Sequence, residues 1–361
     1  MRPHLKMIVL VTIVILVPFF TAIGGPYTER GINSYVGPDG TPSTPWTTNA
    51  VINPIFRGWA TVVVSFEPAP GVDPIDFNIP TMALGPSYSH IYSGGADIYD
   101  EFISYDIVSL GDLTQADINA GAQPGRITLS FSETIRDQNG YDFVVFENGF
   151  RYLDNGYFCD LGYVEVSSNG TDFVRFPSVS LTASRVGAFG TIDITNIYNL
   201  AGKHPNWIGD DNDSFTGTPF DLSELENEPL VLSGDVNLNN INYVRIVDIP
   251  GSGDFYDEAT HYGYSDNHPI YDAWVTHGSG GFDLEAIGVL HSQKYSGDIN
   301  LDGVVDYKDL AIFAQCWLSH FGDDNYLPRC DMAKPKDLFV DFKDFAAFAN
   351  DWGEVELWRG N

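Results

Sequence analysis

The chain has 361 residues, with 18 lysines and arginines against 49 aspartates and glutamates, which gives a formal net charge of −31 at pH 7. A protein this acidic is a poor ligand for nucleic acids or anionic membranes, because phosphate groups are held by clusters of lysine and arginine. The length fits about two domains, and the many aromatic, glycine and proline residues are typical of a folded, turn-rich β protein.

Residues 1–24 have the pattern of a secretory signal peptide. Arg2 and Lys6 precede an apolar run over Met7–Val17, and small residues follow up to Gly24. The run is short for a membrane span, so the pattern predicts cleavage near Gly24 and a secreted, extracellular or cell-surface protein. An uncleaved N-terminal anchor is the alternative. No second apolar run follows, and we expect no membrane span in the mature form.

Residues 25–291 carry the signals of one antiparallel β-domain. Alternating or continuous runs of β-branched and aromatic residues predict strands, and short Gly-rich loops separate most of them. The predicted strands are Trp59–Phe66, Ile107–Leu110, Arg126–Phe131, Tyr141–Glu147, Tyr163–Ser167, Phe173–Phe176, Tyr243–Ile249 and Phe282–Leu290. Asn169-Gly170 is a strong hairpin signal, since both residues tolerate positive φ. Strands and helices do not alternate, so we expect a mainly β fold, a sandwich of two antiparallel sheets.

Aromatic residues between positions 255 and 275 are the candidate ligand-binding residues of this domain. Their flat apolar faces, with polar groups nearby, suit stacking on sugar rings. The candidates are Tyr262, Tyr264, Tyr271 and Trp274. The alternative is that these side chains tie their loops onto the sandwich.

Acidic residues crowd several loops of the same domain, where they repel one another unless a cation or backbone donors compensate. The crowded acids are Asp142, Glu147, Asp210, Asp211, Asp213, Asp248, Asp254, Asp283 and Glu285. Two interpretations stay open: a structural calcium in the large domain, or a solvated acidic face with turn-forming aspartates. An acid pair arises by chance in so acidic a domain, and no zinc, P-loop or nucleophile-base motif appears, so the sequence identifies no catalytic residue.

Residues 298–309, D-I-N-L-D-G-V-V-D-Y-K-D, have the spacing of an EF-hand calcium loop. Side-chain oxygens stand at loop positions 1, 3, 5, 9 and 12, glycine stands at position 6, and position 7 offers its backbone carbonyl. The predicted metal ligands are Asp298, Asn300, Asp302, Val304, Asp306 and Asp309. Calcium takes about six to eight oxygen ligands, so this spacing predicts Ca²⁺ as the cofactor.

An apolar helical stripe follows the loop, and the whole unit returns 35 residues later as an internal duplication. Val305–Asp309 becomes Val340–Asp344. The stripe Leu310, Phe313, Ala314 and Trp317 becomes Phe345, Phe348, Ala349 and Trp352.

The second loop has lost part of the ligand pattern. At the fixed offset, Ala333 and Pro335 occupy positions 1 and 3, and Leu338 replaces the turn glycine. Asp331 restores position 1 only with an insertion. The remaining acids Asp337, Asp341 and Asp344 therefore predict a weak second metal loop.

Residues 298–352 resemble a type I dockerin, the duplicated calcium-loop module by which secreted polysaccharide-degrading proteins dock onto cohesin domains. Dockerins also use aspartate at position 12, as at Asp309. The resemblance implies calcium binding, a cohesin-like partner and a role in polysaccharide processing. Tyr307-Lys308 and Phe342-Lys343 stand where dockerins carry the small hydroxyl residues that select the partner, so the implied partner differs from the familiar cohesins.

The large domain resembles two further groups of proteins. Its segments V-E-V-S-S-N-G-T-D-F, Y-V-R-I-V-D and F-D-L-E-A-I-G-V are similar to the second half of discoidin-type galactose-binding jelly rolls. The span 25–291 is similar to uncharacterised secreted cell-surface proteins of environmental bacteria. The first resemblance implies a jelly-roll sandwich that binds carbohydrate or another surface polymer, and the second brings no assigned function.

The expected organisation is a signal peptide over 1–24, a β-sandwich over 25–291, a polar linker over 292–297, a dockerin-like module over 298–354 and a tail over 355–361. The preferred hypothesis is a secreted, non-catalytic binding protein. A glycoside hydrolase or polysaccharide lyase carrying a dockerin is the second hypothesis, and a structural cell-surface protein without a ligand is the third.

The chain has three cysteines, at positions 159, 316 and 330. Cys316 and Cys330 both lie between the two repeats, and an exported protein meets an oxidising environment. We therefore expect a Cys316–Cys330 disulfide, with Cys159 left unpaired.

Overall fold

The computed structural model describes residues 24–45, 47–70, 72, 77–87, 107–151, 156–204, 206, 215–277, 280–292, 295–300, 303–333 and 337–354. Several sequence expectations fall outside these residues. They concern the signal peptide before residue 24, the tail 355–361, the ligand Asp302 and the loop acids Asp210, Asp211 and Asp213.

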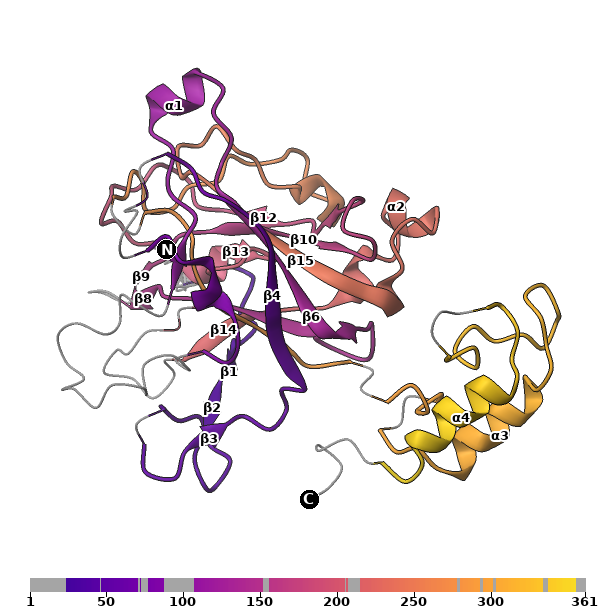
Figure 1. Cartoon of the computed structure of the whole chain (residues 1–361). Helices are drawn as coiled ribbons and strands as arrows, with labels where there is room; N and C mark the ends of the chain where they lie inside the picture. The colour runs from indigo at the N-terminus through magenta and orange to yellow at the C-terminus, as the bar shows by residue number, and fades with distance from the viewer. Residues whose placement is uncertain are drawn as a thin grey trace, which may run out of the picture.

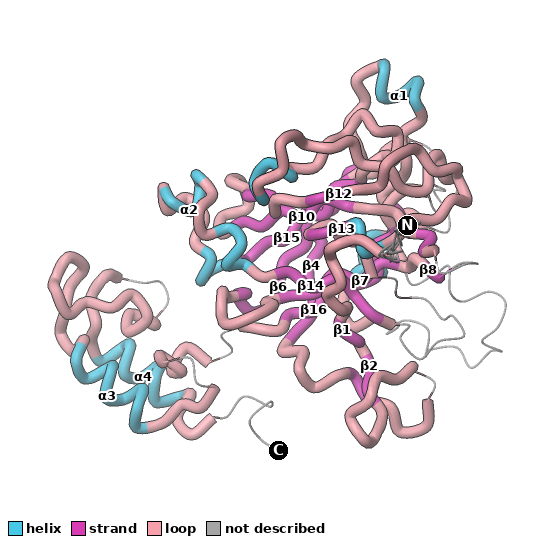
Figure 2. The backbone as a smooth tube through the Cα atoms, turned by 180° about the vertical axis from the view of Figure 1, so that it is seen from behind, coloured by secondary structure: helices cyan, strands magenta, loops and turns pink. Residues whose placement is uncertain are grey.

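The large domain is built on one antiparallel sheet that curls around its core (Figures 1 and 2). The strand order is β1-β14-β7-β16-β4-β6-β15-β10-β11, and β5 also pairs with β16. The bounds are β1 Ile32–Asn33, β4 Gly58–Glu67, β5 Val108–Ser109, β6 Arg126–Ile135, β7 Phe143–Glu147, β10 Gly162–Ser167, β11 Val174–Arg175, β14 Thr216–Phe220, β15 Ile241–Asp248 and β16 Asp283–Val289. Three short ribbons lie outside this sheet: β2 Tyr35–Val36 with β3 Val51–Ile52, β8 Phe150–Arg151 with β9 Tyr157–Phe158, and β12 Val179–Ser180 with β13 Ile197–Tyr198.

Strand β4 joins the two halves of the sheet. Its first two residues, Gly58 and Trp59, pair with the end of β16, and the rest of the strand pairs with β6. The main core lies between the halves, where Val145 of β7 and Ile287 of β16 belong to the same buried cluster as Val244 of β15. The mainly β, antiparallel expectation is therefore confirmed. The two expected layers are joined into one curled sheet, because β4 pairs along both of its edges.

The predicted strands of the large domain are present, with ends that differ by a few residues. The hairpin between β10 and β11 pairs Glu165 with Arg175, and Gly170 in its turn has φ +78°. Gly170 therefore adopts the positive φ that made the Asn-Gly pair a hairpin signal. Strand β6 runs to Ile135, four residues beyond the predicted end at Phe131, because β15 continues to pair with it as far as Ile135.

The helices of the described residues are few, and the two longest belong to the C-terminal module. The α-helices are α1 Gln115–Asn119, α2 Pro229–Leu232, α3 Tyr307–Gln315 and α4 Phe342–Asn350. Single 3₁₀ turns cover Pro80–Ala83, Ile194–Asn196, Leu222–Leu225, Leu238–Asn240 and Ala259–Tyr262. None of these helices has the length and apolar character needed to span a bilayer.

Candidate metal centre

The C-terminal module consists of two loop-helix units that pair with each other, and α3 and α4 lie side by side in both views (Figures 1 and 2). The Val305 amide donates to the Glu354 carbonyl at 3.0 Å, and the Gly353 amide donates to the Val305 carbonyl at 3.0 Å. The same bonds recur 35 positions away, where Val340 exchanges hydrogen bonds with Leu318 and Ser319 at 3.0 Å each. Each loop is thus tied to the chain that follows the other helix.

Backbone amides donate hydrogen bonds to the acids at both ends of the first loop. Asp309 is fully buried, and its two carboxylate oxygens accept the amides of Asn300 and Asp306, each at 2.9 Å. Asp298 is 2% exposed, and its Oδ2 accepts the Gly303 amide at 2.9 Å. Asp306 caps α3 through a capping box with Asp309. Of the predicted ligands, Asp298, Asn300, Val304, Asp306 and Asp309 therefore lie on one compact loop.

The second loop repeats this geometry with a residue that the fixed offset misses. Asp331 Oδ2 accepts the Leu338 amide at 3.0 Å, as Asp298 Oδ2 accepts that of Gly303. Leu338 has φ +63°, in the left-handed region occupied by Gly303 at φ +80°. Asp331 therefore stands where Asp298 stands in the first loop, and the insertion that this alignment requires is two residues long.

The far end of the second loop also matches the first. Asp344 Oδ1 accepts the amides of Met332 and Ala333 at 2.7 and 2.8 Å, and its Oδ2 accepts that of Asp341 at 2.8 Å. Lys343 Nζ lies 2.7 Å from Asp337 Oδ2, so a cation of the chain already pairs with that acid. Lys343 would therefore compete with a metal ion for Asp337 in the second loop.

The burial of the loop acids fits a bound cation. Asp298, Asp309, Asp331 and Asp344 are each at most 2% exposed. Asp331 Oδ1 is buried and has no hydrogen-bond partner among the described residues. An ionised oxygen without a donor or a cation is costly to bury, and calcium is the hard cation that accepts carboxylate, amide and carbonyl oxygens together.

Two exposed aromatic residues stand at equivalent places in the repeats. Tyr307 is 77% exposed and packs edge-on against Trp352, with ring centroids 5.1 Å apart. Phe342 is 75% exposed and packs in the same way against Trp317 at 5.0 Å. Each exposed ring therefore rests on the tryptophan of the other repeat, and an exposed lysine follows it, Lys308 or Lys343.

The three cysteines are buried, and each has a free thiol. Cys316 and Cys330 share the core of the C-terminal module. Burial, followed by a hydrogen bond with Cys316, raises the pKa of the Cys330 thiol above its usual range. Cys159 lies in a separate cluster of the β-domain. The expected Cys316–Cys330 disulfide stays a prediction, and the two thiols are neighbours.

The predicted ligand-binding aromatics of the β-domain make separate contacts. The Tyr262 hydroxyl donates to Glu224 Oε2 at 2.7 Å, and the Tyr264 hydroxyl lies 3.0 Å from that of Tyr27. Trp274 Nε1 donates to the Leu113 carbonyl at 2.9 Å. Tyr271 packs on Gly253, whose Cα has no room for a side chain beneath the ring. These contacts favour the interpretation in which the aromatics tie loops to the sheet.

Most of the crowded acids of the β-domain that the structure describes are buried. Asp142, Glu147, Asp248, Asp283 and Glu285 are each at most 3% exposed. The alternative of a solvated acidic face is therefore wrong for these five. Asp254 alone among the described members of that set is exposed.

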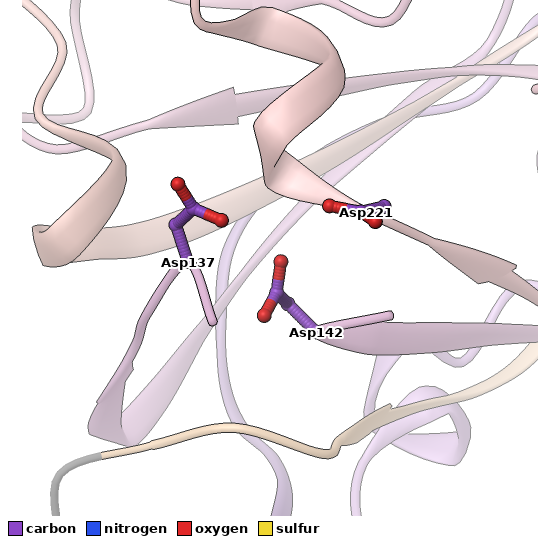
Figure 3. Close-up of side chains that lie close together, drawn as sticks. All are labelled: Asp137, Asp142 and Asp221. Atoms are coloured by element: carbon purple, nitrogen blue, oxygen red, sulfur yellow. The ribbon is translucent and has the colours of Figure 1, made fainter. Parts of the chain in front are cut away.

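Asp137, Asp142 and Asp221 form an acidic triad that sequence spacing did not single out (Figure 3). In the described part of the chain, they are the group whose ligand oxygens all lie within 4.8 Å of one another. Asp142 already accepts the amides of Gln138 and Leu222 and a bond from the His291 ring, at 2.8 to 3.0 Å. Asp221 caps a 3₁₀ turn. Hydrogen bonds from the chain itself thus satisfy the carboxylate of Asp142, the buried member of the triad.

A scan of the chain against models of known protein families finds no match, and a search of curated proteins finds no similar sequence. The functional interpretation therefore depends on the geometry above.

Asp137 gives the triad a measurable pH dependence. Burial and the charges of Asp142 and Asp221 raise the pKa of Asp137 from 3.8 to about 6. A carboxyl whose folded pKa is raised holds its proton more tightly in the folded state, so its contribution to stability falls as pH rises through that window. We expect Asp137→Asn to match wild type below about pH 4 and to exceed it in stability above about pH 6, by urea unfolding.

Asp39 supplies the control, because hydrogen bonds from Thr41 lower the pKa of this exposed acid. Asp39→Asn should show the opposite sign, with any loss of stability confined to neutral pH. Equal pH profiles for wild type and Asp137→Asn would contradict the assignment.

Proposed function

We propose that the chain is an exported calcium-binding protein, with a C-terminal module that docks a partner and a non-catalytic β-domain that binds carbohydrate or another surface polymer. One observation carries this proposal. The two repeats each bury an aspartate at both ends of a short loop, and the orphaned Asp331 oxygen occurs where calcium-loop spacing requires a ligand. A cation explains both features at once.

Calcium in this proposal is part of the module's fold. The buried core of the module is small, and it includes Ile299 and Val305 of the first loop and Val340 of the second. A core of this size gives limited stability by itself. An ion that binds only the folded state adds a free energy that grows with its concentration, about 4 kcal/mol at a thousandfold excess over Kd.

The docking surface of this proposal is the pair of aromatic positions Tyr307 and Phe342, each with its lysine. Large exposed aromatics are enriched at the centres of protein interfaces, where they provide rigid apolar area. The exposed lysines lie beside acids of their own loops, so the two rings are the distinctive part of the surface. A cohesin-like partner with an apolar centre fits this surface.

The sugar-binding part of the proposal finds its best support in a pocket of about 460 Å³. Its volume is in the range of small-molecule sites, and its lining mixes rings with charged groups. The lining includes Tyr27, Arg30, Tyr157 and Lys203. Tyr264, one of the predicted aromatics, contacts the hydroxyl group of the lining residue Tyr27. The antiparallel halves around one core also support the galactose-binding-like jelly roll as the finer description of the fold.

Calcium removal should unfold the C-terminal module while the β-domain stays folded. Helices α3 and α4 are the longest helices among the described residues, so circular dichroism at the helical minimum reports mainly on this module. We expect the full chain to lose this signal in EDTA.

Asp309→Asn should remove the tighter calcium site, and Asp331→Asn the weaker one, in calorimetric titration. Asp323→Asn is the matched control, because Asp323 is exposed and lies between the loops. Helicity that ignores EDTA would contradict the proposal.

Docking should depend on the two exposed rings and on calcium. We expect the full chain to bind at least one member of a panel of cohesin domains in calcium, and Tyr307→Ala/Phe342→Ala to weaken this binding by about 10-fold or more. Phe321→Ala is the control, since Phe321 is 71% exposed and stands outside the repeated pair. The helical signal must stay unchanged in all variants. Equal binding by the double variant and the control would exclude this surface, and a panel without any binder would leave the module without a cohesin function.

Glycan binding should follow the pocket and spare the aromatic loops. On a glycan array with calcium present, Arg30→Ala should weaken binding because Arg30 is exposed and lines the pocket. Trp274→Ala should leave binding unchanged, since the indole is held by Leu113 and by Arg185. A loss confined to Trp274→Ala would return the site to the 255–275 loops. An array without any bound glycan would contradict the carbohydrate proposal.

A further inference from the structure

The β-domain buries a second set of carboxylates, away from the C-terminal module. The members are Asp112, Glu147, Asp160, Asp248, Asp272, Asp283 and Glu285, and none is more than 8% exposed. Burial raises the pKa of Glu147, Asp160, Asp248 and Asp272 well above the usual range, and neighbouring carboxylates raise each further. No basic side chain is among the main influences on these four acids.

Two members of this set, Asp112 and Asp248, are linked through Thr276. Asp112 Oδ2 accepts the Thr276 amide at 2.9 Å, and the Thr276 hydroxyl accepts the Gly281 amide at 2.8 Å. The next amide, of Phe282, donates to Asp248 Oδ1 at 2.8 Å. Asp112 is also the carboxylate that most strongly raises the pKa of Asp248. One oxygen of each acid is therefore fixed by a common stretch of backbone.

The other oxygen of each acid is left without a partner. Asp112 Oδ1 and Asp248 Oδ2 are buried and have no hydrogen-bond partner among the described residues. A proton held by one of the two acids is the alternative to a cation, because burial raises the pKa of both. A cation between them satisfies both oxygens and removes the charge repulsion.

Asp112 also opens onto solvent through a pocket of about 190 Å³. The wall includes Thr114 and Asp117 at the start of α1, together with Thr276, His277 and Gly280. This space admits an ion with several water molecules. The pocket gives an ion a path from solvent to the Asp112 carboxyl group.

We propose that Asp112 and Asp248 hold a calcium ion in the β-domain, with backbone carbonyls and waters of this pocket completing its shell. Calcium accepts a shell of mixed carboxylate, carbonyl and water oxygens, whereas magnesium demands a near-ideal octahedron. The ion would fasten the segment after β5 to the end of β15 and the start of β16. This site is independent of the C-terminal loops. Its two ligands, Asp112 and Asp248, lie 136 positions apart in the sequence.

The test counts calcium ions in a full chain whose C-terminal loops are disabled. In an Asp309→Asn/Asp331→Asn background, native mass spectrometry should find one retained calcium. Adding Asp112→Asn or Asp248→Asn should remove it, and adding Asp254→Asn should not, because Asp254 is an exposed acid near the same region. The thermal midpoint of the β-domain should fall in EDTA in the background chain and in the Asp254→Asn chain only.

The opposite results overturn the proposal. A background chain that retains no calcium and melts identically in EDTA excludes the site, whether or not the variants fold. Retention of the ion after both Asp112→Asn and Asp248→Asn places it elsewhere. If neutralising these acids raises the melting temperature equally with and without calcium, the pair is a source of internal repulsion only.

Discussion

The free-energy cost of burying a carboxylate is the constraint common to both parts of this protein. In the C-terminal module, Asp298, Asp309, Asp331 and Asp344 are withdrawn from water within two short loops. In the β-domain, seven further acids are withdrawn at the ends of β5, β7, β15 and β16 and in the loops beside them. Backbone amides supply part of the compensation, as at Asp309 and Asp344. Where amides are lacking, the fold needs cations, protons or both.

The compensation differs between the two loops of the module. The first loop has its glycine at the left-handed position. The second loop places Leu338 in the same conformation, which costs an L-residue about 1–2 kcal/mol relative to the right-handed region. It also engages Asp337 with Lys343. The duplicated loop therefore keeps its shape with a strained residue and with an ion pair supplied by the chain itself.

Much of the architecture is readable from local sequence. The strands around Val164 and Val244 and the helical stripe ending at Trp317 follow from periodicity, and the Asn169-Gly170 turn follows from its tolerance of positive φ. The role of strand β4 could not be predicted in this way. It joins both halves of the sheet, which depends on its pairing partners and leaves no local signal in the sequence.

The same limit applies to the candidate sites. Asp331 was named in the sequence only as a residue that an insertion would bring to position 1, because a fixed repeat offset cannot detect an insertion of two residues. Aligning the second loop by its acids at both ends locates that insertion. Asp112 gave no signal at all, since it is a single acid after a short strand, and only the fold brings it near Asp248. The aromatics around Tyr262 left two interpretations open, because an aromatic-rich loop looks the same in sequence whether its rings face a ligand or the sheet.

The cross-pairing of the repeats also has a consequence for how the module is made. Val305, in the first loop, takes its backbone partners from Gly353 and Glu354, nearly fifty residues later. A ribosome releases the chain from its N-terminal end, so the first loop cannot close until the second repeat has been synthesised. The two halves must therefore fold as one late event. Release of the complete chain from the ribosome is therefore the earliest point at which the first loop can take its final backbone partners.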